Sequence, residues 1–189
     1  MGYSLWIIVA LLAALVLYGI LIFNSLVRGR NHAVEAWSDI ETHLKRRYDL
    51  IPNLVETVKG YAAHERSTLE MVIGARNAAM NQSGGAEHCT ETENALGQTL
   101  KSIFALAEAY PDLKASQNFV ELQQDIADAE DKIQASRRFY NSVVMTYNTR
   151  TATFPSMLVA GLFKFKAMAY FELDEAEKAE AYKPVKVQF

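Results

Sequence analysis

Residues that cross-link a chain or interrupt helices are scarce in this sequence of 189 residues. It holds one cysteine, four prolines and nine glycines. The lone thiol, Cys89, excludes an internal disulfide, which agrees with a reducing compartment. Few prolines and glycines leave room for long uninterrupted helices, and the length suits one domain with a real core rather than two.

Patterns that carry metal or catalytic chemistry are also lacking. The four histidines, at positions 32, 43, 64 and 88, do not pair at the spacing of metal ligands. His88 and Cys89 are adjacent, but no second pair completes a site. There is no Gly-x-Ser-x-Gly elbow, and "QSGG" at 82–85 lacks the lysine of a phosphate-binding loop. We expect no metal, no cofactor and no enzyme, and keep catalysis as a third hypothesis.

A surplus of positive charge is absent as well. The formal net charge is −3 with both signs mixed, so nucleic acid is not an expected partner. No charged side chain occurs before Arg28, and residues 3–23 are apolar almost throughout. About 20 apolar residues suffice to cross a bilayer, so we predict a transmembrane helix embedded in lipid. A cleaved signal peptide is the alternative, although its basic start and small-residue cleavage site are missing.

Basic residues follow the predicted span and none precedes it. Arg28, Arg30, Lys45, Arg46 and Arg47 lie within about 20 residues of its end. The positive-inside rule therefore predicts a single-pass protein with a short N-terminus outside and the C-terminal part in the cytoplasm.

One apolar repeat with helical spacing passes through Pro52. Its members are Trp37, Ile40, Leu44, Arg47, Ile51, Leu54, Val58 and Tyr61. A loop would usually reset the phase, so Pro52 is predicted to lie within a helix. There its missing N–H leaves the Tyr48 carbonyl unpaired and favours a kink. The alternative is a helix that starts here, with Asp49 as N-cap.

Further helices are predicted downstream. A second follows in residues 65–80, then a polar loop over 81–94, a third helix from Leu96 to Tyr110, and a long fourth helix with Ser116 as N-cap. The apolar stripe of the fourth helix covers more than four heptads and needs a long partner. Only the helix that leaves the membrane is long enough.

The predicted fold is therefore all-α. We expect a single N-terminal transmembrane helix followed by an elongated antiparallel bundle of four to five helices. The expected parts are residues 1–27 with the span, 28–171 as the bundle and 172–189 as a charged tail. Because each helical residue advances about 1.5 Å, the returning fourth helix brings the chain back to the membrane.

The segment that returns, residues 153–171, is strongly apolar and is predicted to form a helix. It either caps the core of the bundle or forms a surface for the membrane or for self-association. Residues of the second interpretation include Phe154, Pro155, Leu162, Phe163 and Phe165.

Several polar residues fall in or beside the apolar seams. They are Arg47, Asn53, Arg76, Arg137, Asn141 and Asn148. A buried arginine needs a partner, and Glu130 or Asp131 is predicted to pair with Arg47. The first interpretation is a buried network that fixes helix register. The alternatives are a small binding pocket beside the Pro52 kink, or simple exposure.

Three stretches carry a family resemblance. Residues 46–76 ("RRYDLIPNLVETVKGYAAHERSTLEMVIGAR"), 118–149 and 154–165 ("FPSMLVAGLFKF") resemble the LemA family of bacterial membrane proteins. The motif positions are Arg47, Tyr48, Asp49, Pro52, Asn53, Arg76, Tyr140, Asn141, Tyr147, Asn148, Phe154 and Pro155. One departure is Ala129-Glu130-Asp131, where the family often has Thr-Glu-Asn, which leaves Glu130 in place.

The resemblance implies a bacterial inner-membrane protein with one N-terminal span, a helical cytoplasmic bundle and no established enzymatic activity. A relative in magnetosome-forming bacteria is linked to formation of an organelle membrane. By analogy we expect a scaffold or adaptor that associates with itself, as a homo-oligomer, or with other membrane proteins. The alternative is a membrane-remodelling protein that uses residues 153–171.

Overall fold

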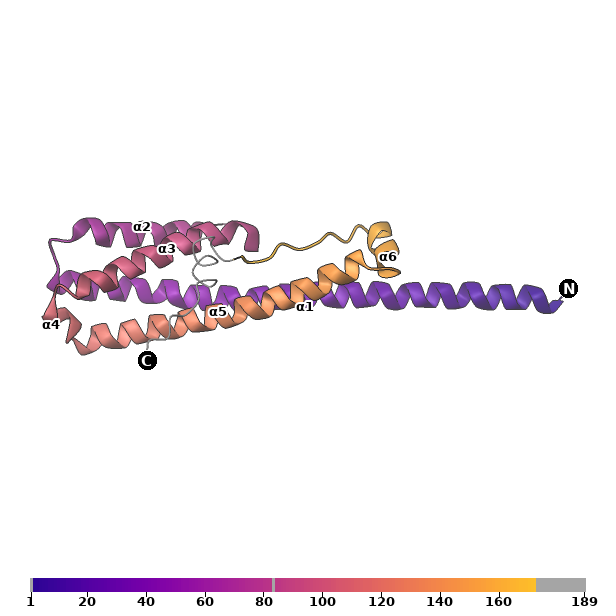
Figure 1. The fold of residues 1–189 in the computed structure, drawn as a ribbon, viewed down its shortest axis with the longest axis horizontal. Coiled ribbons are helices and arrows are strands. Elements are labelled where there is room, and N and C mark those ends of the chain that lie inside the picture. The colour runs from indigo at the N-terminus through magenta and orange to yellow at the C-terminus, as the bar shows by residue number, and fades with distance from the viewer. Residues whose placement is uncertain (1, 83, 173–189) are drawn as a thin grey trace, which may run out of the picture. The chain divides into compact units, whose positions relative to one another are not determined.

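The computed structural model describes residues 2–82 and 84–172 (Figure 1). Those residues form six helices and no strand, which confirms the all-α prediction. The helices are α1 (Gly2–Tyr61), α2 (Arg66–Asn81), α3 (Ala86–Ala107), α4 (Pro111–Lys114), α5 (Gln117–Ala152) and α6 (Ser156–Leu162). Apart from Glu172, the predicted charged tail lies outside the described residues.

Helix α1 is one uninterrupted element of 60 residues. Its N-terminal part contains an 18-residue window with a mean hydropathy of 2.9, none of it buried. By length and composition, this is the one helix among the described residues that can cross a membrane. The predicted transmembrane segment thus coincides with the N-terminal part of α1.

The apolar seam of α1 confirms that Pro52 lies inside the helix. Ile40, Leu44 and Ile51 before the proline and Leu54 and Val58 after it are all buried. Burial on both sides of Pro52 follows one helical phase, so the alternative in which a helix begins at Asp49 is wrong. At the end of the seam Tyr61 is exposed, contrary to its place in the repeat.

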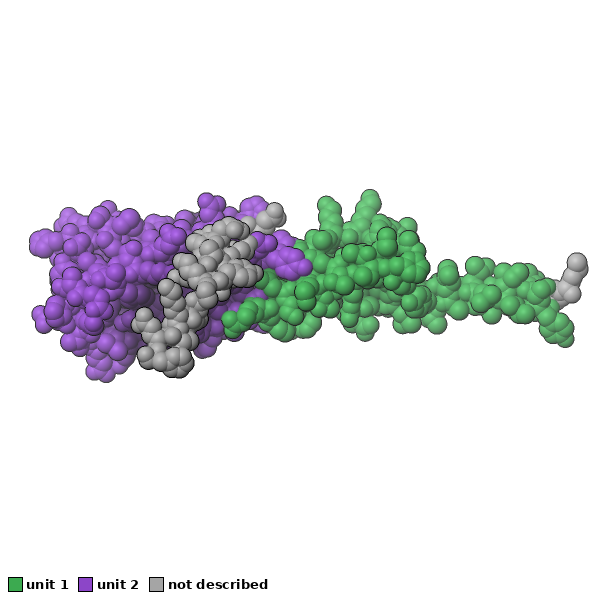
Figure 2. All heavy atoms as spheres, viewed as in Figure 1, with its two compact units in different colours: residues 1–38, 138–168 green, residues 39–137, 169–189 purple. Residues whose placement is uncertain are grey.

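The chain divides into two compact units, coloured in Figure 2. Unit 1 comprises residues 1–38 and 138–168, and unit 2 comprises 39–137 and 169–189. Both units thus combine segments far apart in the sequence. They group residues by mutual contact, and so they do not test the predicted division at residues 27 and 171.

Within unit 1, α1 and α5 run in opposite directions. Arg150 of α5 donates to Ser25 of α1 at 3.1 Å, and the Tyr140 ring lies 5.5 Å from the Trp37 ring. Residues further along α1 thus contact residues earlier in α5. These contacts confirm that the fourth predicted helix pairs with the helix that leaves the apolar segment.

Within unit 2, α2 packs against α3, and the predicted loop over 81–94 is mostly wrong. Helix α3 already begins at Ala86. The buried side of the helix, which contains Leu96 and Leu100, continues back to Ala86, and the polar residues between them lie mostly on its other sides. Glutamate, threonine and histidine are tolerated on a helix surface, so polarity alone did not mark a loop here.

The predicted helix over 153–171 is also largely wrong. Only α6 is helical, and it ends where Lys164 takes a positive φ of 56°. The Phe165 amide donates to the Ala160 carbonyl and the Lys164 amide to the Gly161 carbonyl, at 2.9 and 3.3 Å. This Schellman arrangement closes the helix. Residues 165–172 continue without regular secondary structure.

Candidate functional site

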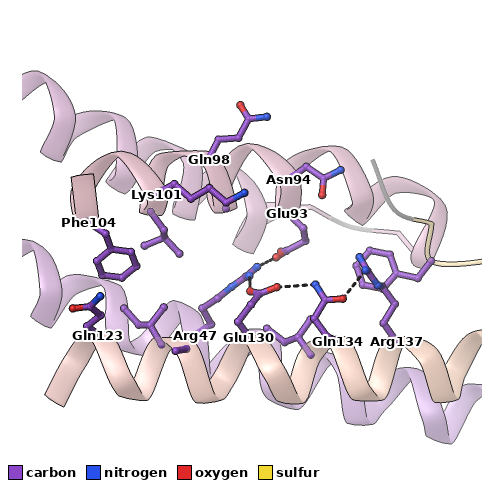
Figure 3. A pocket seen from close by; sticks show the side chains of 16 residues that line it. Arg47, Glu93, Asn94, Gln98, Lys101, Phe104, Gln123, Glu130, Gln134 and Arg137 are labelled. Carbon is purple, nitrogen blue, oxygen red and sulfur yellow. Dashed lines mark hydrogen bonds and ion pairs between the residues drawn. The ribbon is translucent and has the colours of Figure 1, made fainter. Parts of the chain in front are cut away.

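Arg47, in the C-terminal half of α1, is the most deeply buried charged residue among those that the structure describes. Its side chain is only 4% exposed and forms ion pairs with Glu93 of α3 and Glu130 of α5 (Figure 3). The predicted pairing with Glu130 is therefore confirmed, whereas Asp131, the other proposed partner, is exposed. One guanidinium joins three helices, because its planar fork of N–H donors can serve two carboxylates at once.

Glu93 was missed from the sequence, since it lies in the segment interpreted as a loop. It accepts a hydrogen bond from Arg47 through one carboxylate oxygen and from the Tyr48 hydroxyl through the other. The spacing of apolar residues in this segment could have identified Glu93. Glu93 falls on the buried stripe of α3, three residues before Leu96 and seven after Ala86, both buried. A carboxylate on such a stripe requires a buried donor.

Two weakly acidic groups near this cluster are held protonated at neutral pH. Burial raises the pKa of the Tyr48 hydroxyl to about 12, although the nearby Arg47 charge opposes the shift. Burial also raises the pKa of the Cys89 thiol, and the Glu41 carboxylate adds to this effect. A thiol is a strong nucleophile only as its thiolate, so Cys89 is not activated here.

The hydrogen bonds continue along α5 toward a cavity (Figure 3). The Gln134 amide donates to Glu130 at 3.0 Å and accepts from Arg137 at 2.5 Å. The Arg137 guanidinium carbon lies 5.9 Å from the centre of the Phe171 ring. These groups line a cavity of about 500 Å³, together with Asn94, Gln98, Lys101, Phe104 and Gln123 among others.

The Arg47 cluster connects α1, α3 and α5. Both carboxylates of the Arg47 cluster already accept donors, and the described residues contain no group of three or more metal-ligating side chains. Arg47 Nε is buried without a hydrogen-bond partner among the described groups. A buried charge that joins three elements is stabilising only while all its partners stay in place.

Pro52 leaves the Tyr48 carbonyl without its helical donor, and Arg76 of α2 supplies another. Arg76 Nε donates to the Tyr48 carbonyl oxygen at 2.7 Å. Neither Pro52 nor Tyr48 is among the residues that line the cavity described above, so a pocket beside the proline stays a prediction. Of the neighbouring motif residues, Asp49 pairs with Lys45 at 3.0 Å on the surface and Asn53 is exposed.

The motif residues of unit 1 bind the segment that follows α6. The Tyr147 hydroxyl donates to the Lys166 carbonyl at 3.1 Å. Asn148 makes two bonds with Met168, donating to its carbonyl and accepting from its amide, each at 2.9 Å. Tyr140 packs beside Trp37, and Asn141 is half-buried. Tyr147 and Asn148 thus pair backbone groups of Lys166 and Met168, which lie outside any helix.

The side chains of the predicted apolar surface are mostly exposed. Phe154 and Leu162 are 77% and 76% exposed, and Phe163 is 56% exposed. Pro155 directly precedes α6 and is half-buried, and the peptide bond between Phe154 and Pro155 is cis. The rings of Phe163 and Phe165 lie 4.7 and 5.6 Å from the ring of Phe23, near the end of the apolar stretch of α1. Phe163 and Phe165 therefore adjoin the end of the apolar stretch of α1.

Comparison with known proteins identifies the family. The sequence pattern of the LemA family matches residues 36–189. The chain belongs to the LemA family. It is 27% identical over 157 residues to protein LemA of Metamycoplasma hominis, covering 83% of this chain and 72% of that protein. It is 23% identical over 174 residues to magnetosome protein MamQ of Magnetospirillum gryphiswaldense, covering 79% of this chain and 64% of MamQ.

The LemA family match includes the whole Arg47 cluster. Arg47, Glu93 and Glu130 all fall within residues 36–189, whereas the apolar part of α1 precedes the match. A third relative, magnetosome protein MamQ 2 of Paramagnetospirillum magneticum, is 23% identical over 175 residues. This chain spans 64% of each MamQ protein, so those relatives contain additional sequence.

Proposed function

We propose that this LemA family chain is a membrane-anchored helical scaffold of the bacterial cell membrane, which acts by association with itself or with other membrane proteins. The observation that carries the proposal is the exposed apolar surface formed by Phe154, Leu158, Leu162 and Phe163, which we call the α6 patch. Exposed apolar residues are common singly, but a group of large ones indicates an interaction site.

The polar residues of the family motifs support a structural role. Arg47, Arg76 and Asn148 each connect segments distant in sequence. These bonds lie within the protein, and the proposal includes no catalytic step. In unit 1, the bonds of Tyr147 and Asn148 to residues 166 and 168 would hold the segment beside the α6 patch in place for a partner.

We propose a single-pass orientation with the part that follows the span in the cytoplasm. Arg28 and Arg30 directly follow the apolar stretch of α1, and no basic side chain precedes it. Basic residues are retained on the cytoplasmic side during insertion. Cysteine labelling of intact cells at position 132, in a Cys89→Ser background, tests this orientation, because a cytoplasmic site should resist an impermeant reagent.

The association is tested in cells with a photoreactive residue at position 162. Leu162 lies in the α6 patch, and Lys132 on the exposed surface of α5 is the matched control position. We expect a discrete crosslinked product from position 162 and none from position 132. Equal crosslinking from both positions, together with a monomeric mass in detergent, would contradict the scaffold.

A second candidate function is insertion of the α6 patch into the bilayer interface, with local remodelling of the membrane. The contacts of Phe163 and Phe165 with Phe23 favour it, because they tie the patch to the apolar part of α1. Amphipathic surfaces at the headgroup boundary bind through apolar side chains of this kind.

Spin labels separate the two candidates. In a Cys89→Ser background, full-length protein in lipid nanodiscs is labelled at position 162 or 132. Insertion predicts that the label at 162 is relaxed by oxygen, which dissolves in lipid, more than by a water-soluble nickel complex. The label at 132 should show the opposite preference. A label at 162 that is fully accessible to nickel would exclude insertion.

A further inference from the structure

Charge is distributed very unevenly between the two units. Residues 1–38 and 138–168 of unit 1 contain six lysines and arginines and one acidic residue, a formal net charge of +5. The rest of the chain contains 13 basic and 21 acidic residues, a net charge of −8. The positive charge thus collects on the unit that contains the apolar helix. Such clusters beside a membrane span attract anionic lipids.

A groove of about 600 Å³ lies in this positive unit between α1 and α5. It is lined by Arg28, Asn31 and His32 of α1 and by Ser142, Thr146 and Arg150 of α5. Gly29 also lines it, and a Cβ at that position would lie 3.4 Å from the Tyr147 ring. The absence of a side chain there lets the Tyr147 ring pack close to the backbone of α1.

The groove begins at the depth expected for lipid headgroups. At 1.5 Å per residue, Arg28 lies about 8 Å beyond Phe23 along α1, and the headgroup layer is roughly 5–8 Å thick. Arg150 reaches closer still, because its Nη1 donates to the Ser25 hydroxyl at 3.1 Å. Both guanidinium groups therefore approach headgroup level if α1 spans the bilayer, and this inference depends on that part of the proposed function.

We propose that this groove binds the phosphate of an anionic phospholipid such as phosphatidylglycerol. Arginine is well suited to phosphate because its N–H donors can bind two oxygens at once. The bond to Ser25 uses one of the five N–H donors of Arg150. Among the described residues, Arg28 has no ion pair with a carboxylate. The Asn31 amide and the Ser142 hydroxyl add neutral donors.

The single acidic residue of unit 1 does not occupy the basic end of the groove. Glu35 pairs with His32 at 3.3 Å. It lies seven residues beyond Arg28, roughly 10 Å along the helix. The phosphate is therefore placed beside Arg28 and Arg150, while the His32–Glu35 pair bounds the other end. The net charge of +5 favours an anionic lipid over a zwitterionic one.

The test uses purified full-length protein in mild detergent with equal amounts of phosphatidylglycerol and phosphatidylcholine. Native mass spectrometry counts the bound lipids. Wild-type protein should retain phosphatidylglycerol preferentially, and Arg28→Gln or Arg150→Gln should each reduce that preference about fivefold. Thr146→Leu should reduce it by a similar factor, because leucine fills the groove without changing the charge.

Lys166→Gln is the matched control. It removes one charge from an exposed side chain of the same unit outside the groove, and the preference should change less than twofold. If Lys166→Gln and Arg150→Gln reduced the preference equally and Thr146→Leu left it unaltered, the lipid would be attracted by the overall positive charge. That result would overturn the proposed site. Far-UV circular dichroism confirms that each variant keeps its helix content.

Inorganic phosphate in large excess distinguishes a lipid from a soluble anion. It should not displace phosphatidylglycerol, because the acyl chains keep the lipid beside the apolar helix. Complete displacement would assign the groove to free phosphate and overturn the lipid proposal. The same spectra report the oligomeric state, so a monomer that still prefers phosphatidylglycerol would exclude stable self-association and leave the lipid site standing.

Discussion

Arg76 of α2 takes the place of the hydrogen-bond donor that Pro52 lacks. Proline at position 52 removes the amide that would bond to the Tyr48 carbonyl, and Arg76 Nε lies 2.7 Å from that oxygen. An unpaired carbonyl would otherwise weaken a helix that carries Arg47 and Tyr48 on adjacent positions. The roles of the family motif residues Pro52 and Arg76 are therefore coupled.

Removing Arg76 should be most harmful while Pro52 is present. We expect Arg76→Ala to lower the free energy of unfolding by about 1–3 kcal/mol, since a buried carbonyl loses its donor. In a Pro52→Ala background the helix supplies its own amide, so the same substitution should have a clearly smaller effect. Urea unfolding of the four proteins measures this coupling, and strictly additive effects would contradict it.

Glu93 should be essential for stability, although its segment resembles a loop. Glu93→Ala removes one carboxylate from the buried Arg47, whose other partner, the Glu130 side chain, is 41% exposed. Breaking a buried ion pair from one side destabilises a protein by about 3–5 kcal/mol.

Glu91→Ala is the control for that substitution, because Glu91 is exposed on the same helix. It should change stability by less than about 0.5 kcal/mol. Thermal unfolding followed by circular dichroism compares the two variants. A similar small change in both would mean that Arg47 does not depend on Glu93.

The sequence predicted the helices whose buried residues follow a clear repeat. It did not predict a buried residue within a polar stretch, or a segment whose backbone is bound by distant side chains. The seam from Ile40 to Val58 and the pair Arg47–Glu130 could be predicted, because helical spacing places each residue on a known side. The partner Glu93 could not be identified once its segment was assigned to a loop. Its stripe is visible only when counted backward from Leu96.

The aromatic segment after α5 illustrates the second difficulty. Composition indicated a helix through residue 171, yet Lys164 ends α6 in a conformation that usually favours glycine. Beyond it, Tyr147 and Asn148 bind the backbone of Lys166 and Met168. Such bonds depend on tertiary position, so local apolar content could not predict that they replace a helix.

The raised pKa of Tyr48 predicts a loss of stability in alkaline solution. The hydroxyl has a pKa of about 12 in the folded protein against an ordinary value near 10. Its contribution to stability is therefore complete below pH 10 and is lost as the pH rises toward 12. Urea midpoints should fall over this range for the wild-type protein.

Tyr48→Phe isolates this effect from the other tyrosines. The variant has no ionisable group at position 48, so its urea midpoint should fall less between pH 10 and 12. At neutral pH it should be less stable than wild type by about 1 kcal/mol or more, since Glu93 loses a donor. Parallel curves for the two proteins above pH 10 would contradict the assignment.

Asn148 should control whether residues 165–168 stay in place beside α5. Its amide group forms a two-bond contact with Met168, which protects the Met168 N–H from solvent. Asn148→Ala removes both bonds, and hydrogen exchange at the Met168 amide should accelerate about tenfold, as expected for loss of roughly one net hydrogen bond. Thr149→Ala, at the adjacent exposed position, should leave this exchange unchanged. Because Phe165 reaches Phe23 from the same segment, a spin label at position 162 should become more mobile in Asn148→Ala alone.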